Sequence, residues 1–180
     1  MKIDVFCHVF PKRVFQQCFE LAPNLKDMGK RIRNVPMLFD LDLRFRVMDQ
    51  FGEYQQVISM ASPPLEAFAG PDVTPGLARI ANDAMAELVD RYPDRFAGFA
   101  VCLPMYHLPS SPVGVRVGRR AALGARGVRI FSNVNGLHYR DEFRFLFAAM
   151  SAYGLPIWLH PTRGADFPDY LTEHRSPYEI

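Results

Sequence analysis

Two histidines, His8 and His160, are the residues in this chain best suited to chemistry, and each ends a short apolar run. His8 closes a run that starts at Ile3, and His160 closes the run Ile-Trp-Leu-His that starts at Ile157. Neutral imidazole is a good ligand for Zn²⁺, and a catalytic zinc usually has three protein ligands and a water. Either histidine alone is explained as well by a hydrogen bond that caps a strand end. Two of them at matching strand ends favour a divalent metal site.

The elements that would carry these histidines alternate regularly along the chain. The pattern predicts strands over residues 3–6, 56–60, 96–103, 127–131 and 157–160, and helices over 11–21, 40–51, from 74 onward, 113–123 and 141–153. Five strand–helix alternations predict a parallel sheet with right-handed crossovers. Loops that follow the C-terminal ends of such strands host ligands. The pattern therefore predicts that the two imidazoles meet at one rim.

Three segments need separate comment. Thr74 is expected to cap the clearest helix, with Pro75 as its first helical residue. Residues 113–123 alternate like a strand and contain two glycines, which disfavour a helix, yet the order of the flanking elements requires a crossover helix there. Residues 22–38 are predicted to be an irregular insertion, rich in charge, Asn and Pro, within a single domain spanning 1–180.

The fold class is α/β, and two architectures satisfy this order. A doubly wound sheet usually binds phosphates on a glycine-rich first turn, but the first turn here reads Cys-His-Val-Phe-Pro. This favours a TIM-type (β/α)8 barrel. The 180 residues supply about five βα units, fewer than the roughly 250 residues of a complete barrel. The first and fifth strands would expose edges, so a homodimer, a dependence on further residues or only marginal stability is expected.

Composition excludes several classes of protein. A net charge of +2 with no long basic stripe argues against nucleic acid and acidic membranes as partners. Three cysteines without a CxxC pair favour a reducing compartment. The N-terminus has no secretory pattern, and no apolar stretch approaches the length of a membrane span. A cytoplasmic location is the expectation.

Four stretches carry a resemblance to a known family: residues 3–11, residues 44–50, residues 124–130 with 133–136, and Gly-Leu-Pro-Ile-Trp-Leu-His-Pro at 154–161. Together they resemble the amidohydrolase-related metal enzymes (amidohydrolase family 2) close to aminocarboxymuconate-semialdehyde decarboxylase. The resemblance runs along the whole chain, and the last stretch is the most distinctive.

The resemblance implies a divalent metal, usually zinc. In the family the ion is held by two histidines of the first motif, a histidine after strand five and an aspartate after strand eight. His8 and His160 match two of these positions, while Phe6 stands at a third and cannot bind a metal. The aspartate and the family's catalytic histidine would lie beyond residue 180, so the chain looks C-terminally truncated. We therefore expect weak or absent zinc and little activity from this chain alone.

The reaction that the resemblance implies is non-oxidative decarboxylation of a small carboxylated aromatic or muconate-like substrate. Hydrolysis of a lactone or amide, and metal-free binding on the same fold, remain alternatives. Arg44, Arg46 and Arg163 are candidate anchors for a carboxylate. A solvated helix face explains Arg44 and Arg46 about as well. Asn133 is a further candidate, although turn formation explains the Asn-Val-Asn-Gly segment better.

Overall fold

The computed structural model describes residues 1–23, 32–107, 123–134, 137–138 and 143–162. Its strands are β1 (Lys2–Val9), β2 (Tyr54–Met60), β3 (Phe96–Cys102), β4 (Ala125–Phe131), β5 (Asn133–Val134), β6 (Leu137–His138) and β7 (Ile157–His160). Its helices are α1 (Lys12–Leu21), α3 (Leu41–Met48), α4 (Thr74–Arg91) and α6 (Arg144–Ala152), with single 3-10 turns at Pro36–Leu38, Asp49–Phe51, Leu65–Ala67 and Met105–His107. Strands β5 and β6 form a separate antiparallel pair.

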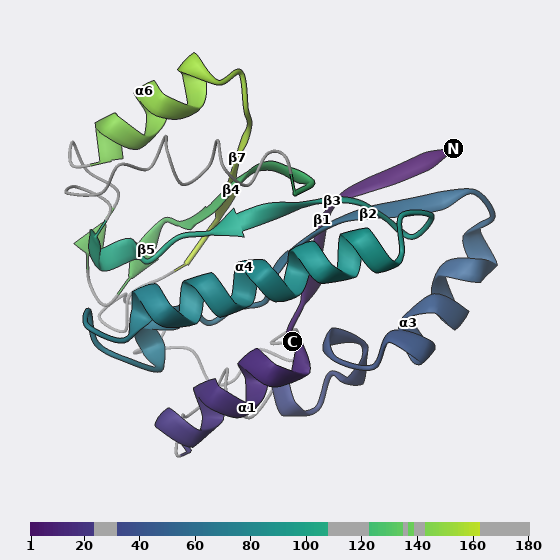
Figure 1. The fold of residues 1–180 in the computed structure, drawn as a ribbon, viewed down its shortest axis with the longest axis horizontal. Helices are drawn as coiled ribbons and strands as arrows, with labels where there is room; N and C mark the ends of the chain where they lie inside the picture. The colour runs from purple at the N-terminus through teal and green to yellow at the C-terminus, as the bar shows by residue number, and fades with distance from the viewer. Residues whose placement is uncertain (24–31, 108–122, 135–136, 139–142, 163–180) are drawn as a thin grey trace, which may run out of the picture.

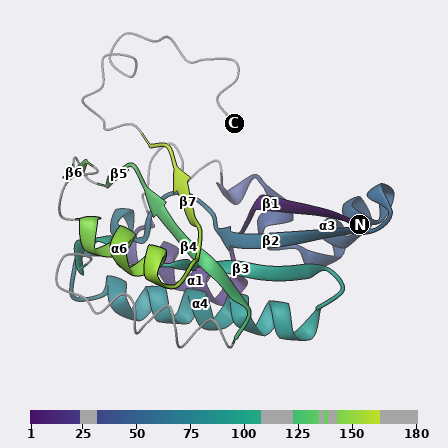
Figure 2. The ribbon, with the colours of Figure 1, turned by 90° about the horizontal axis from the view of Figure 1, so that it is seen from above.

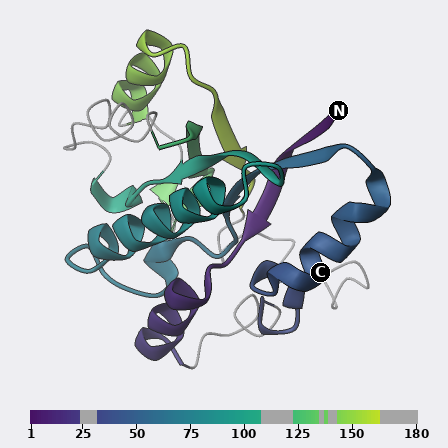
Figure 3. The same ribbon diagram turned by 45° about the vertical axis from the view of Figure 1, so that its right-hand side comes forward.

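The main sheet has five parallel strands in the order β1-β2-β3-β4-β7. It curls into half of a barrel, which confirms the predicted fold class. Helix α4 runs along the sheet in Figure 1, and α3 and α6 lie toward opposite ends of the molecule in Figures 1 and 3. In the view from above, the strands of the main sheet lie between α6 and α3 (Figure 2). Ile58, Phe99, Val128 and Ile130 of the sheet are fully buried in one continuous core with Met85 of α4.

The predicted strands and most predicted helices are observed within a few residues of their expected ends. The predicted cap of α4 is wrong: the helix begins at Thr74 itself, Val73 occupies the cap position, and no side chain caps it. Thr74 Oγ1 is buried and has no hydrogen-bond partner among the described residues. Of the helix predicted over 113–123, only Leu123 lies within the described residues, in a turn. Within the predicted insertion 22–38, residues 24–31 also lie outside the described part.

Strand β1 contains a bulge just before the site. Asp4 pairs with Gln56 and Cys7 with Ile58, so β1 has one residue more than β2 over this stretch. Side chains satisfy both polar groups of the bulged peptide bond: the Phe6 N–H donates to Asp4 Oδ1, and the Val5 carbonyl accepts from the Trp158 indole N–H of β7. The bulge is therefore stabilised by two side chains, Asp4 of β1 and Trp158 of β7.

Gly127 in β4 makes room for Trp158. A Cβ at this position would stand 2.3 Å from the Pro156 carbonyl oxygen and 2.4 Å from Trp158 Cζ3. We expect Gly127→Ala to lower the free energy of unfolding by about 1–3 kcal/mol or more through overpacking. Urea denaturation measures the change. Gly76→Ala in α4, where nothing lies within 4 Å of the new Cβ, is the control and should be neutral or slightly stabilising.

The two outer strands of the sheet expose apolar side chains. Ile3 and Val5 of β1 and Leu159 of β7 are all exposed, and within the described part of the chain each of these strands pairs with another strand on one side only. The expected homodimer stays a prediction. Among the described residues, no helix combines the length and apolar character needed to cross a membrane.

Candidate metal centre

His8 and His160 come together inside the half-barrel. Both lie at the C-terminal ends of strands at opposite edges of the sheet, β1 and β7. In a flat sheet these strands would be roughly 19 Å apart, four spacings of about 4.8 Å. The imidazole centroids are instead 5.6 Å apart, because the sheet curls. The predicted convergence of the two rings is confirmed.

His8 is held in one neutral tautomer. Its Nδ1 lies 2.9 Å from Ser59 Oγ, and the Ser59 hydroxyl donates to the Cys7 carbonyl at 3.1 Å. The hydroxyl hydrogen is thus already used, so the Ser59 oxygen must accept from the Nδ1–H of His8. This leaves a lone pair on His8 Nε2, the arrangement common in metal-binding histidines.

His160 adopts the same tautomer through different partners. Its Nδ1 donates to the Pro161 carbonyl at 3.1 Å, because a carbonyl can only accept. Its Nε2 lies 3.1 Å from Ser62 Oγ, which in turn accepts from Arg129 Nη2 at 3.1 Å. Since a guanidinium can only donate, the Ser62 hydrogen is free to point at Nε2. The lone pair of His160 therefore accepts a hydrogen bond from Ser62.

Both imidazoles are uncharged at neutral pH. Burial, followed by the nearby charge of Arg129, lowers the pKa of His8 to about 3 and the pKa of His160 to about 4. Neutral imidazole is the form that binds a metal. Neither Nε2 therefore carries a proton of its own, although that of His160 accepts a hydrogen bond from Ser62.

Arg129 is a functional candidate that sequence reasoning missed. It lies in β4, is 3% exposed, and places its guanidinium 4.5 Å from the ring centre of Phe131. Its Nε and Nη1 have no partner among the described residues, and burial lowers its pKa to about 10. The available signal was an arginine inside the otherwise apolar run Gly-Val-Arg-Ile-Phe, since charge is rarely buried without a partner.

The arginines proposed as anchors separate into distinct environments. Arg44 is 4% exposed and donates to Gln56 Oε1 at 2.8 Å and to the carbonyls of His8 and Met37 at 2.9 Å each. Its guanidinium therefore holds the backbone of His8 in place. The alternative that Arg44 belongs to a solvated helix face is wrong, because the side chain is buried. Arg46 is exposed on the same helix. Arg163 and the side chain of Asn133 lie outside the described residues.

The donor set fits a divalent ion in part. An imidazole nitrogen lies about 2.0–2.1 Å from zinc, so rings on one ion have centroids at most roughly 6.4 Å apart. The spacing and tautomers of His8 and His160 satisfy this condition. Phe6, whose ring lies 5.2 Å from that of His8 and 6.2 Å from that of His160, contributes no donor. The described stretches contain no group of three or more potential metal ligands.

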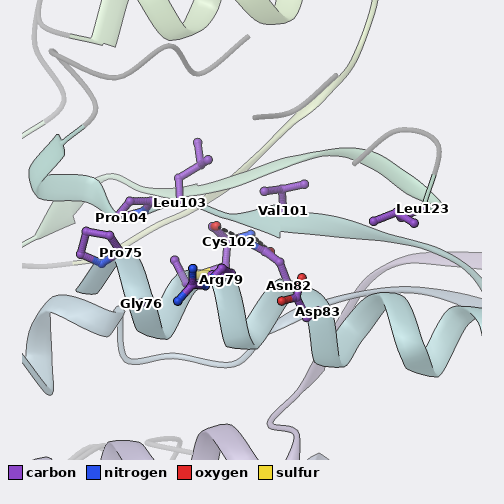
Figure 4. A pocket seen from close by; sticks show the side chains of 11 residues that line it. Pro75, Gly76, Arg79, Asn82, Asp83, Val101, Cys102, Leu103, Pro104 and Leu123 are labelled. Carbon is purple, nitrogen blue, oxygen red and sulfur yellow. Dashed lines mark hydrogen bonds between the residues drawn. The ribbon is translucent and has the colours of Figure 1, made fainter. Parts of the chain in front are cut away.

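A separate hollow of about 560 Å³ lies between α4 and the end of β3 (Figure 4). The amide of Asn82 in its wall donates to the Cys102 carbonyl and accepts from the Cys102 N–H, both at 2.8 Å, so it already has structural partners. Leu123, which follows the undescribed stretch 108–122, also lines this hollow.

Comparison with known proteins agrees with this geometry. The chain is 28% identical to 2-amino-3-carboxymuconate-6-semialdehyde decarboxylase of Dictyostelium discoideum over 89% of its length and 49% of the relative. It is 42% identical to gamma-resorcylate decarboxylase of a Polaromonas species over 67% of its length and 38% of the relative. The structure of 5-carboxyvanillate decarboxylase from Sphingomonas paucimobilis matches with a TM-score of 0.75 and 25% identity, covering 99% of this chain and 56% of that one.

The chain thus spans about half the length or less of the curated relatives that it matches. The family described as Amidohydrolase matches residues 3–180, nearly the whole chain. With its half-barrel of parallel strands and its convergent strand-end histidines, the chain belongs to the amidohydrolase family.

Proposed function

We propose that this chain forms the metal-binding side of a carboxy-lyase that decarboxylates a small carboxylated aromatic or muconate-like substrate. The observation that carries the proposal is the convergence of His8 and His160 in tautomers that leave both Nε2 lone pairs unprotonated. The relatives support the reaction class, because curated and solved proteins named as decarboxylases match most of the chain.

His8 and His160 would hold the ion, which we propose to be zinc. The structure of a dihydroxybenzoic acid decarboxylase from a Polaromonas species contains manganese, so manganese is the other candidate. Once bound, such an ion polarises an oxygen atom and stabilises the negative charge that develops on it. The remaining donors would come from outside the described residues, because Phe6 offers none.

Arg129 would bind an anionic group of the substrate. Two of its nitrogens lack partners among the described residues, and a buried guanidinium without a counter-charge is costly. It lies beside the metal candidates, bonded through Ser62 to His160. Phe131 and Phe6 supply aromatic faces near the same imidazoles. Arg46, Arg163 and Asn133 remain proposed contacts, whereas Arg44 would act through the His8 backbone.

Two measurements test the proposal together. In equilibrium dialysis against excess Zn²⁺ we expect weak binding of one ion per chain, lost in His160→Ala and in His8→Ala. Gamma-resorcylate should quench Trp158, the only tryptophan, more strongly than resorcinol, which lacks the carboxylate. Arg129→Met should weaken gamma-resorcylate binding by about 10-fold or more, since charge-assisted hydrogen bonds are worth about 1.5–3 kcal/mol. Absence of zinc binding, or equal binding of both phenols, would contradict the proposal.

A metal-free binding protein is the second candidate function. Phe6 favours it, because an apolar ring stands beside both imidazoles where a third donor would be needed. The same dialysis separates the two candidates: carboxylate binding that depends on Arg129 but not on metal would support the binding protein.

A further inference from the structure

The two site histidines differ in which nitrogen their serine contacts. Ser59 lies against Nδ1 of His8, on the far side of the ring from the free lone pair. Ser62 lies against Nε2 of His160, which carries the lone pair itself. The serines are three residues apart, at the end of β2 and just after it, and both are buried. The two serines therefore contact different ring nitrogens: Ser59 contacts Nδ1 of His8, and Ser62 contacts Nε2 of His160.

We propose that Ser62 competes with the metal for His160 and that Arg129 holds it in that position. This inference rests on the proposed function, since it concerns the same metal site. For His160 to bind an ion through Nε2, the Ser62 hydroxyl must give up its hydrogen bond. For His8 no such exchange is needed, because its Nε2 has no hydrogen-bond partner among the described residues. Ser59 is thus a positioning residue, whereas Ser62 opposes metal binding.

The direction of the hydrogen bonds supports the assignment to Arg129. Its Nη2 donates to Ser62 Oγ, which occupies an oxygen lone pair and leaves the hydroxyl hydrogen pointing to His160. The guanidinium is itself fixed, being buried and stacked on Phe131. A rigid donor behind a hydroxyl keeps that hydroxyl from turning away from Nε2.

Opposite signs are expected when each serine is removed. A typical hydrogen bond contributes about 0.5–1.5 kcal/mol net, so Ser62→Ala should raise metal affinity by about 2- to 13-fold. Losing a hydrogen bond that orients a metal-binding histidine typically costs about 10- to 100-fold, so Ser59→Ala should lower metal affinity by that factor. The two substitutions remove the same hydroxyl from neighbouring sites, and each is the matched control for the other.

Titration with Co²⁺ alone, followed by the quenching of Trp158, measures these affinities without any turnover assay. Thermal melts without metal show whether each variant folds. Ser62→Ala also removes the hydrogen-bond acceptor of Arg129 Nη2. A second comparison avoids this effect: the single variant Arg129→Met is compared with the double variant that carries both Arg129→Met and Ser62→Ala. Co²⁺ affinity should again rise when Ser62→Ala is added.

The outcomes separate this inference from the proposed function. Tighter Co²⁺ binding in Ser62→Ala and weaker binding in Ser59→Ala support it. If wild type binds Co²⁺ and Ser62→Ala binds it equally or more weakly, Ser62 does not compete, and only this inference is overturned. If wild type and all variants fail to bind Co²⁺, removing the Ser62 hydroxyl from His160 Nε2 does not produce a metal site. Both the proposed function and the competition by Ser62 are then overturned.

Discussion

Replacing Arg44 with methionine is expected to lower the free energy of unfolding by about 3–5 kcal/mol, a large effect for a single substitution. The guanidinium donates to Gln56 Oε1 and to the carbonyls of His8 and Met37. Methionine fills a similar volume but donates nothing, so three acceptors lose their donor. The bond to Gln56 is buried and the two bonds to carbonyls are part-buried. A buried group left unsatisfied costs about 1–3 kcal/mol, and a part-buried one costs less. Urea denaturation followed by circular dichroism measures the loss.

Arg46→Met is the matched control, because Arg46 lies on the same helix but is exposed. Its effect should stay within about 0.5 kcal/mol, as for most surface substitutions. A loss below about 1 kcal/mol for Arg44→Met would mean that water or neighbouring groups satisfy the three acceptors. Arg44 would then have no role in holding the backbone of His8.

The position of Arg44 shows a limit of the sequence pattern. The apolar residues Leu41, Phe45 and Met48 predicted one face of the α3 segment, and Arg44 lies on that same face at helical spacing. An arginine within an apolar stripe is a signal for a buried cation, but sequence does not say which acceptors surround it. Two of its three acceptors are backbone carbonyls, which every residue possesses. Side-chain types therefore could not single them out.

The histidine pair was predictable for a different reason. Parallel strands end at one edge, so residue type and position in each run suffice to place His8 and His160 at one rim. The serine and arginine relay was not predictable, because it depends on the curl of the sheet and on the loop after β2. Ser59 and Ser62 gave only the signals of a strand and of a Ser-Pro-Pro loop. The bulge at Val5–Phe6 likewise depends on the Trp158 side chain of β7, which meets the Val5 carbonyl of β1 only in the folded state.

Phe6→His is expected to raise the affinity for Zn²⁺ by on the order of 100-fold. Three histidines are an established ligand set for catalytic zinc, and two alone leave the ion weakly held. The Phe6 ring lies 5.2 Å from that of His8 and 6.2 Å from that of His160, and both distances are below the maximum of roughly 6.4 Å for two imidazoles on one ion. Phe6 is 46% exposed, so an imidazole there need not bury an unsatisfied nitrogen. Isothermal titration with Zn²⁺, with a chelator as competitor, measures the gain.

Phe6→Leu controls for the loss of the aromatic ring and should leave zinc affinity unchanged. Adding His160→Ala to Phe6→His tests whether the new imidazole works with the existing pair, since affinity should then fall back to about the wild-type value. If Phe6→His gains nothing, the bulge directs position 6 away from the ion. The weak metal binding would then be a property of the bent strand and not of the missing ligand. If the gain appears, position 6 lies close enough to His8 and His160 to supply a third ligand, and the bulged backbone of β1 does not prevent it.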